Sequence, residues 1–131
     1  MLRSVIVFSS FIFFSCQSPE TAVFTELHDN ASIKSIAEMQ GEKRSGLYVE
    51  LDARGNLLTQ YHFENDKLNG KQTTYNTQGY PQIVAHYQAG QLQGDYLRYD
   101  KSGRQVQEKC TYKNGNKHGK AQWFFNKPKD A

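Results

Sequence analysis

Residues 94–115 read GDYLRYDKSGRQVQEKCTYKNG, and this stretch decides the fold because the preceding sequence repeats its layout. Gly94 opens a short strand with aromatic side chains, a polar turn closes on Gly103, and a longer strand leads through Tyr112 to an Asn-Gly turn. The same layout begins 24 positions earlier at Gly70 and another 24 positions earlier at Gly46. A fixed period of this length indicates a repeat architecture in which neighbouring units stack on one another.

The repeat register divides the chain into units. They are a degenerate unit at 22–45, complete units at 46–69, 70–93 and 94–118, and a half-unit at 119–126. The third complete unit is one residue longer, and we expect the extra residue to form a β-bulge near residues 105–107. A chain of 131 residues has room for one small domain.

Hydrophobic periodicity within the units predicts β-strands. Leu57, Thr59, Tyr61 and Phe63 are apolar or neutral, whereas the residues between them are mostly polar. Such alternation is typical of a half-buried strand, and Asn-Gly at 114–115 is the strongest short signal for a hairpin turn. The sequence therefore predicts an all-β fold: a single extended antiparallel meander of stacked β-hairpin repeats of about 24 residues each.

Composition suggests how that sheet is packed. A hydrophobic share of 37% with an aromatic share of 13% favours a thin sheet with a narrow aromatic core. One register of the repeat, which we expect to form a ladder in that core, holds Leu51, Tyr75, Tyr99 and Phe124. We expect Tyr75 and Tyr99 to be largely buried, and Tyr87 and Tyr112 to be partly buried.

Glycines recur at the turn positions of the units. They are Gly46, Gly55, Gly70, Gly79, Gly90, Gly94, Gly103, Gly115 and Gly119. Recurrence at one place in every unit favours a role in backbone geometry at positive φ, which glycine adopts without steric cost. We therefore expect alanine substitutions to reduce stability by similar amounts in each unit.

These units resemble a known family. GLYVELDARGNLLTQYHFENDKLNG at 46–70 and GDYLRYDKSGRQVQEKCTYKNGNKHG at 94–119 are similar to the bacterial variant of the MORN-type repeat, in particular to the antitoxin-like YwqK family. The shared features include the Asp/Asn-x-x-Gly turn and the Tyr-x-x-Gly-x-x-x-Gly ending, as in Tyr87, Gly90 and Gly94. The resemblance covers residues 22–126. It implies a hairpin-repeat fold and a protein-binding role, with antitoxin or immunity activity against a toxin as one form of that role.

The first sixteen residues resemble a bacterial lipoprotein signal. Arg3 precedes an apolar run at 5–14, which is too short to span a bilayer as a helix. Ser15 and Cys16 follow, as in a lipobox, although Phe13 stands where that pattern prefers an aliphatic residue. An ordinary signal peptide cut nearby and a buried N-terminal strand are the alternatives.

The resemblance to a lipoprotein signal implies a cellular location for the protein. It predicts a signal peptide at 1–15, a lipid-modified Cys16 and a polar tether at 16–21. Two or more acyl chains give stable membrane anchoring where one does not. We therefore expect a membrane-anchored protein of the bacterial cell envelope, at the outer membrane in a Gram-negative cell because Gln17 follows the cysteine.

Once the signal segment is removed and Cys16 carries lipid, Cys110 is the only free thiol left in an oxidising compartment. It shares a register with Ala85 and Tyr61 and should face the core. A small buried hydrophobic residue is the favoured interpretation, and a reactive or intermolecular thiol is the alternative.

Residue patterns that carry catalytic chemistry are missing from the sequence. It contains no nucleophile elbow, no zinc-protease motif, no phosphate-binding glycine loop and no paired cysteines. His62 and His86 share a register, but equivalent strands lie about 9–10 Å apart, which strains a shared metal with Zn–N bonds of about 2.0–2.1 Å. We expect a non-catalytic protein without metal or cofactor.

Charge is distributed unevenly along the chain. Residues 17–100 hold 7 basic and 11 acidic residues, a net charge of −4, and residues 101–131 hold 8 basic and 2 acidic residues, a net charge of +6. Such asymmetry can mark an interaction end. A candidate basic patch consists of Lys113, Lys117, Lys120, Lys127 and Lys129, the last two in a tail at 127–131.

This basic end supports an alternative function. A structural envelope protein could use it to contact anionic lipid or cell-wall glycan. The lysines could instead protect an exposed edge strand from pairing. Nucleic acid is not an expected partner, because the aromatic residues lie in the core register rather than on the basic side.

Overall fold

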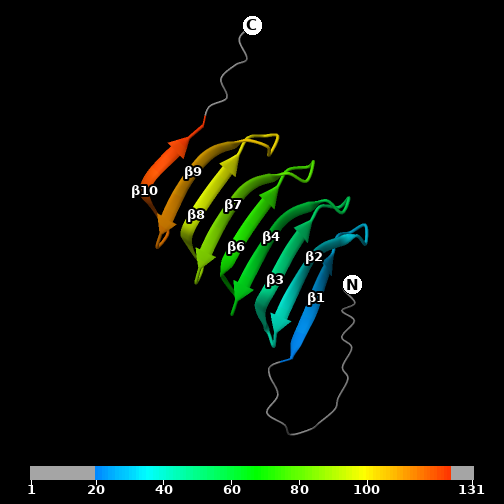
Figure 1. The fold of residues 1–131 in the computed structure, drawn as a ribbon. Coiled ribbons are helices and arrows are strands. Elements are labelled where there is room, and N and C mark those ends of the chain that lie inside the picture. Colours follow the sequence, from blue (N-terminus) through cyan, green and yellow to red (C-terminus); the bar gives the residue numbers. More distant parts are fainter. Residues whose placement is uncertain (1–19, 125–131) are drawn as a thin grey trace.

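A computed structural model describes residues 20–124, which form one open antiparallel sheet and no helix (Figure 1). The strands are β1 (Thr21–Leu27), β2 (Ile33–Gln40), β3 (Lys43–Leu51), β4 (Leu57–Glu64), β5 (Lys67–Leu68), β6 (Gly70–Tyr75), β7 (Pro81–Gln88), β8 (Gln91–Tyr99), β9 (Val106–Lys113) and β10 (Asn116–Trp123). Their spatial order follows the chain, with the short β5 paired to β4. The predicted all-β meander of hairpins is confirmed.

Each unit begins with a hairpin closed by a polar turn. The side-chain Oδ1 of Asp52 accepts hydrogen bonds from the backbone N–H groups of Arg54 (2.9 Å) and Asn56 (2.8 Å). Asn76 accepts two such bonds from the equivalent residues of the next unit. A short polar side chain that bonds its own downstream backbone stabilises a tight turn. These turns explain why Asp or Asn recurs three residues before a glycine.

The extra residue of the third complete unit lies in this turn. The N–H of Asp52 bonds the carbonyl of Asn56, four residues on, whereas the N–H of Asp100 bonds the carbonyl of Gln105, five residues on. Bulges do occur beside the turn, but every complete unit has one, and Gln107 is the bulged residue of the third. The bulge predicted near residues 105–107 is thus present at Gln107, but its attribution to the extra residue is wrong.

Backbone conformation at the other end of each hairpin matches a type I′ turn. Asn114 and Gly115 have φ values of 51° and 78°, and Asn65–Asp66 and Ala89–Gly90 also have positive φ at both positions. The nine glycines named above all lie at positive φ, from 70° at Gly103 to 119° at Gly46. The primed turn suits the right-handed twist of the flanking strands.

The sheet has one layer within residues 20–124, and this determines its burial. The apolar residues that are buried are small: Ala37 (5% exposed), Ala85 (1%) and Cys110 (3%). Tyr75 and Tyr99 are half-buried, in the same range as Tyr87 and Tyr112, so the two pairs do not show the difference in burial that the sequence led us to expect. Tyr87 and Tyr112 are half-buried, as expected. A single layer has no second sheet or helix to cover large side chains.

Several predicted features lie outside the described residues. They are the signal peptide at 1–15, the lipid-attachment residue Cys16, most of the tether at 16–21, the end of the half-unit at 119–126, and the tail at 127–131 with Lys127 and Lys129.

Candidate interaction surface

One face of the sheet gathers tyrosines from most of its hairpins, and we call it the tyrosine face. Its members are Tyr48, Tyr61, Tyr87, Tyr96 and Tyr112, all half-buried. The strand register brings them together, because Tyr48 lies opposite Tyr61 and Tyr96 lies opposite Cys110, two residues before Tyr112. Directly opposed residues of antiparallel strands share a face.

Two aromatic clusters form on this face. In the first, the Tyr48 ring lies 5.9 Å from Tyr61 and 5.7 Å from Phe63, the latter edge-on, and Tyr61 lies 6.1 Å from Phe63. The Arg44 guanidinium stacks 4.3 Å above the Phe63 ring. Aromatic pairs at these separations stabilise by about 0.5–1.5 kcal/mol beyond their burial. The rings are thus held in place while part of their surface stays open to solvent.

The second cluster, near the C-terminal end of the sheet, combines aromatic and charged groups. Tyr96 and Tyr112 lie 5.6 Å apart, beside an ion network centred on Glu108. Glu108 is 8% exposed, and its carboxylate accepts hydrogen bonds from Lys117 Nζ (2.7 Å) and Arg98 Nε (3.2 Å). Lys117, and next Arg98, hold the pKa of Glu108 below its ordinary value against the opposing effect of burial. The buried charge is therefore compensated.

The three lysines of the predicted basic patch that lie in the described residues are divided between the strands of the last hairpin. Lys117 lies opposite Tyr112, on the tyrosine face, where it pairs with Glu108. Lys113 follows Tyr112 along β9 and so belongs to the opposite face, since successive strand residues alternate. Lys113 and Lys120 are exposed. The strand alternation thus places Lys113 and Lys117 on different faces of the last hairpin.

The opposite face holds both histidines considered above. Nδ1 of His62 lies 3.4 Å from the Lys71 carbonyl oxygen, and Nδ1 of His86 lies 3.3 Å from that of Asp95. Within residues 20–124, no group of three or more His, Cys, Asp or Glu side chains is placed to hold a metal ion. The imidazoles contact the backbone of the following strand.

Glu38 occupies the same register in the preceding unit and makes a related contact. Its Oε2 accepts the N–H of Leu47 at 2.8 Å. A Cβ added at Gly46 would collide with this carboxylate. Glycine therefore suits position 46 for two reasons: the backbone has a positive φ, and there is no space for a Cβ.

Cys110 is buried beside Glu108, as a small hydrophobic residue is expected to be. Burial raises the pKa of its thiol. A raised pKa leaves less of the reactive thiolate at neutral pH.

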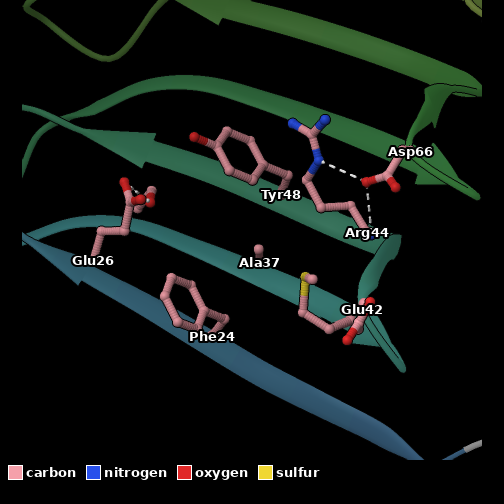
Figure 2. A pocket seen from close by; sticks show the side chains of 9 residues that line it. Phe24, Glu26, Ala37, Glu42, Arg44, Tyr48 and Asp66 are labelled. Atoms are coloured by element: carbon pink, nitrogen blue, oxygen red, sulfur yellow. Dashed lines mark hydrogen bonds and ion pairs between the residues drawn. The ribbon is translucent and has the colours of Figure 1, made fainter. Parts of the chain in front are cut away.

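A hollow of ≈ 290 Å³ opens on the tyrosine face near the N-terminal edge (Figure 2). Phe24 and Tyr48 stand on either side of Ala37, and Met39 also lines the hollow. Its remaining lining is polar and mostly acidic, with Glu26, Ser35, Glu42, Asp66 and Arg44. The repeat register of the sequence could have identified Tyr48, which follows an opening glycine by two residues, as Tyr96 does. The hollow itself could not be predicted from the sequence, because it forms only when three strands are aligned.

No protein-family model, curated protein or solved structure matches this chain. Within residues 20–124, no helix is long and apolar enough to cross a membrane.

Proposed function

We propose that this protein is a non-catalytic, protein-binding repeat module whose tyrosine face is the binding surface. The observation that carries the proposal is the set of half-buried tyrosines that share one face of a one-layer sheet. Tyrosine and arginine are enriched in the central contacts of protein interfaces, and tyrosine offers a large amphipathic area at low entropic cost. The ring clusters around Tyr48 and Tyr96 supply that area in a fixed arrangement.

The proposal includes a cellular location and a repeat family. The protein is a lipoprotein of the bacterial cell envelope, anchored through Cys16, and its units are of the MORN type. The apolar run at 5–14 before Ser15 and Cys16 supports the first statement. The repeat of 24 residues, with a hairpin in each unit, supports the second. An antitoxin or immunity role rests on the resemblance to the YwqK family.

The alternative, a structural envelope protein that binds anionic lipid or glycan through its basic end, has weaker support. The charge of Lys117 is taken up by Glu108 at 2.7 Å. Lys113 and Lys120 remain exposed, but solubility and protection of the β10 edge account for them equally well.

Photo-crosslinking from the two faces tests the proposal. A benzophenone amino acid at Gln72 projects from the tyrosine face, and the same group at the neighbouring Lys71 projects from the opposite face. In the cells that produce the protein, we expect one dominant protein adduct from Gln72, reduced by Tyr61→Ser, and none from Lys71. Equal adducts from both positions, or no protein adduct from Gln72, would refute the proposed binding face.

A further inference from the structure

The hollow near the N-terminal edge is shaped by one small residue between two rings, and we call it the Ala37 notch. Phe24 of β1 lies opposite Ala37 of β2, which lies opposite Tyr48 of β3. Two strand spacings separate the ring-bearing residues by about 9–10 Å. A carbon chain in contact with both rings needs about 7–8 Å, twice the usual carbon–carbon contact distance. The notch is therefore wide enough for an alkyl chain to lie between the rings (Figure 2).

Carboxylates outnumber basic groups around this notch. Glu26, Glu42 and Asp66 line it, against one arginine, Arg44. Arg44 is already engaged, because its Nε donates to Asp66 Oδ1 at 3.2 Å and its guanidinium stacks on a ring outside the notch. Glu42 has no ion pair with any residue of the described part of the chain. The lining thus carries excess negative charge.

The carboxylates are also placed beside the rings. Glu26 Oε2 accepts the Ser35 hydroxyl at 3.2 Å and lies 3.8 Å from Lys34 Nζ, a long and solvent-exposed pair. Burial raises the pKa of the Tyr48 hydroxyl, and the charges of Glu50 and Glu26 raise it further. Phe24, with 57% of its surface exposed, leaves the entrance open at the sheet edge.

From this arrangement we propose that the Ala37 notch binds the side chain of a lysine from the partner protein. This inference rests on the proposed protein-binding function and names the chemistry that the tyrosine face recognises. The methylenes of the lysine lie between Phe24 and Tyr48, and its ammonium group is attracted by the ring faces and by Glu26. Rings with an adjacent carboxylate favour a cation over a neutral or acidic side chain.

The same sheet contains a matched internal control. Ala85 occupies the register of Ala37 two units later, but its neighbours across the strands are Gln72 and Tyr96, so one ring is missing. Next along the same face, Thr74 and Arg98 flank Ile83, whereas Glu26 and Glu50 flank Ser35 in the equivalent place beside Ala37. A neutral residue and a cation thus stand where the N-terminal units have two acidic residues. A lysine side chain should not bind over Ala85.

NMR of the full chain with ¹³C-labelled alanine methyl groups tests this site. The probe is the peptide acetyl-Gly-Lys-Gly-amide, and the comparison peptide carries norleucine, which has a similar alkyl chain without the ammonium group. We expect the lysine peptide to shift the Ala37 methyl signal saturably and to leave the Ala85 signal unchanged. The norleucine peptide should shift neither signal.

Variants of β1 sharpen the test. Phe24→Leu should weaken binding of the lysine peptide by about threefold to tenfold, as expected for loss of one cation–π contact, and Phe24→Tyr should retain binding. Glu26→Gln should weaken binding and reduce its sensitivity to salt. The matched control is Val23→Ala, on the same strand and the opposite face, which should bind as the unchanged protein does.

Four results would overturn the lysine site. They are no saturable shift of the Ala37 signal, an equal response to the norleucine peptide, an equal loss of binding in Val23→Ala and Phe24→Leu, or a saturable shift with neutral chitotriose in place of the lysine peptide. The last would make the notch a glycan site. Crosslinking from Gln72 is independent of this titration, so a protein adduct from Gln72 without a lysine response refutes the notch and leaves the proposed function standing.

Discussion

Alanine substitution of Gly55, Gly79 and Gly103 should separate the cost of backbone geometry from the cost of packing. All three glycines have φ between 70° and 85° and donate their N–H to the carbonyl of the Asp or Asn three residues earlier. Alanine at such φ costs about 1–2 kcal/mol, and the lower entropy of the unfolded chain returns about 0.4–1 kcal/mol. A net loss of about 0.5–1.5 kcal/mol is expected wherever geometry is the whole cost.

The space around the added methyl group differs between the three turns. At Gly55 and Gly79, a Cβ would meet nothing within 4 Å. At Gly103, it would collide with the Cβ of Tyr80 and lie 2.9 Å from the Pro81 carbonyl oxygen. Overpacking adds about 1–3 kcal/mol, so Gly103→Ala should lose about 2–4 kcal/mol in total. The structure therefore predicts a larger loss at Gly103 than the equal losses expected from the sequence.

Urea unfolding followed by circular dichroism and by tyrosine fluorescence measures these losses. Coincident transitions by the two probes are the control, because a repeat protein can lose cooperativity and the free energy is then undefined. Equal losses for the three variants, within about 0.5 kcal/mol, would refute the packing argument. A variant that unfolds like the unchanged protein but abolishes crosslinking from Gln72 would refute the geometric role of that glycine.

Three further predictions concern the membrane anchor, the ion network around Glu108 and the half-buried ring of Tyr99. Cys16→Ser should release the protein from membranes and abolish labelling by a fatty-acid probe; membrane pelleting without any label on the unchanged protein would contradict the lipid anchor. Glu108→Gln should cost about 1.5–3 kcal/mol at pH 7, since hydrogen bonds to a charged group are lost. In the folded protein the pKa of Glu108 lies below its ordinary value of 4.5, so the stability that the Glu108 charge contributes is present above pH 4.5 and is lost as the pH falls through the folded pKa. The difference in melting temperature between the unchanged protein and Glu108→Gln should therefore shrink in acid. A difference independent of pH would exclude the charge as its cause. Tyr99→Ala should cost about 1.5–2.5 kcal/mol in urea unfolding, half the value for a fully buried ring; a loss above about 4 kcal/mol would mean that the ring is covered in solution.

Local chemistry made much of the fold predictable. The Asn-Gly dipeptide at 114–115 and the Asp-x-x-Gly spacing at 52–55 each specify a turn through backbone angles that few other residues adopt. Alternation within β4 specifies a strand, and the 24-residue period specifies that hairpins of one kind follow each other. These features depend on neighbouring residues and can be read without knowledge of distant ones.

Burial was predicted less well, because it depends on what covers a face. Tyr75 and Tyr99 fall in a consistent register, which favours a core position, yet the sheet has no second layer over them within residues 20–124. The sequence spacing between Gly103 and Tyr112 shows that the third unit has an extra residue, but it does not show whether that residue lies in the strand or in the turn. The closing bond from Asp100 to Gln105 places it in the turn.

The sequence by itself determined the hairpins, their turns and their order, because each is encoded within one unit of about 24 residues. Only the tertiary structure decided which side chains meet across strands. Phe24, Ala37 and Tyr48 come from three strands, and Glu108 collects Lys117 and Arg98 from its two neighbouring strands. Such groupings depend on the register between strands, and a slip of one residue would send every side chain to the opposite face. Turn lengths and bulges set that register jointly along the sheet, so the candidate site exists only once the whole sheet has formed.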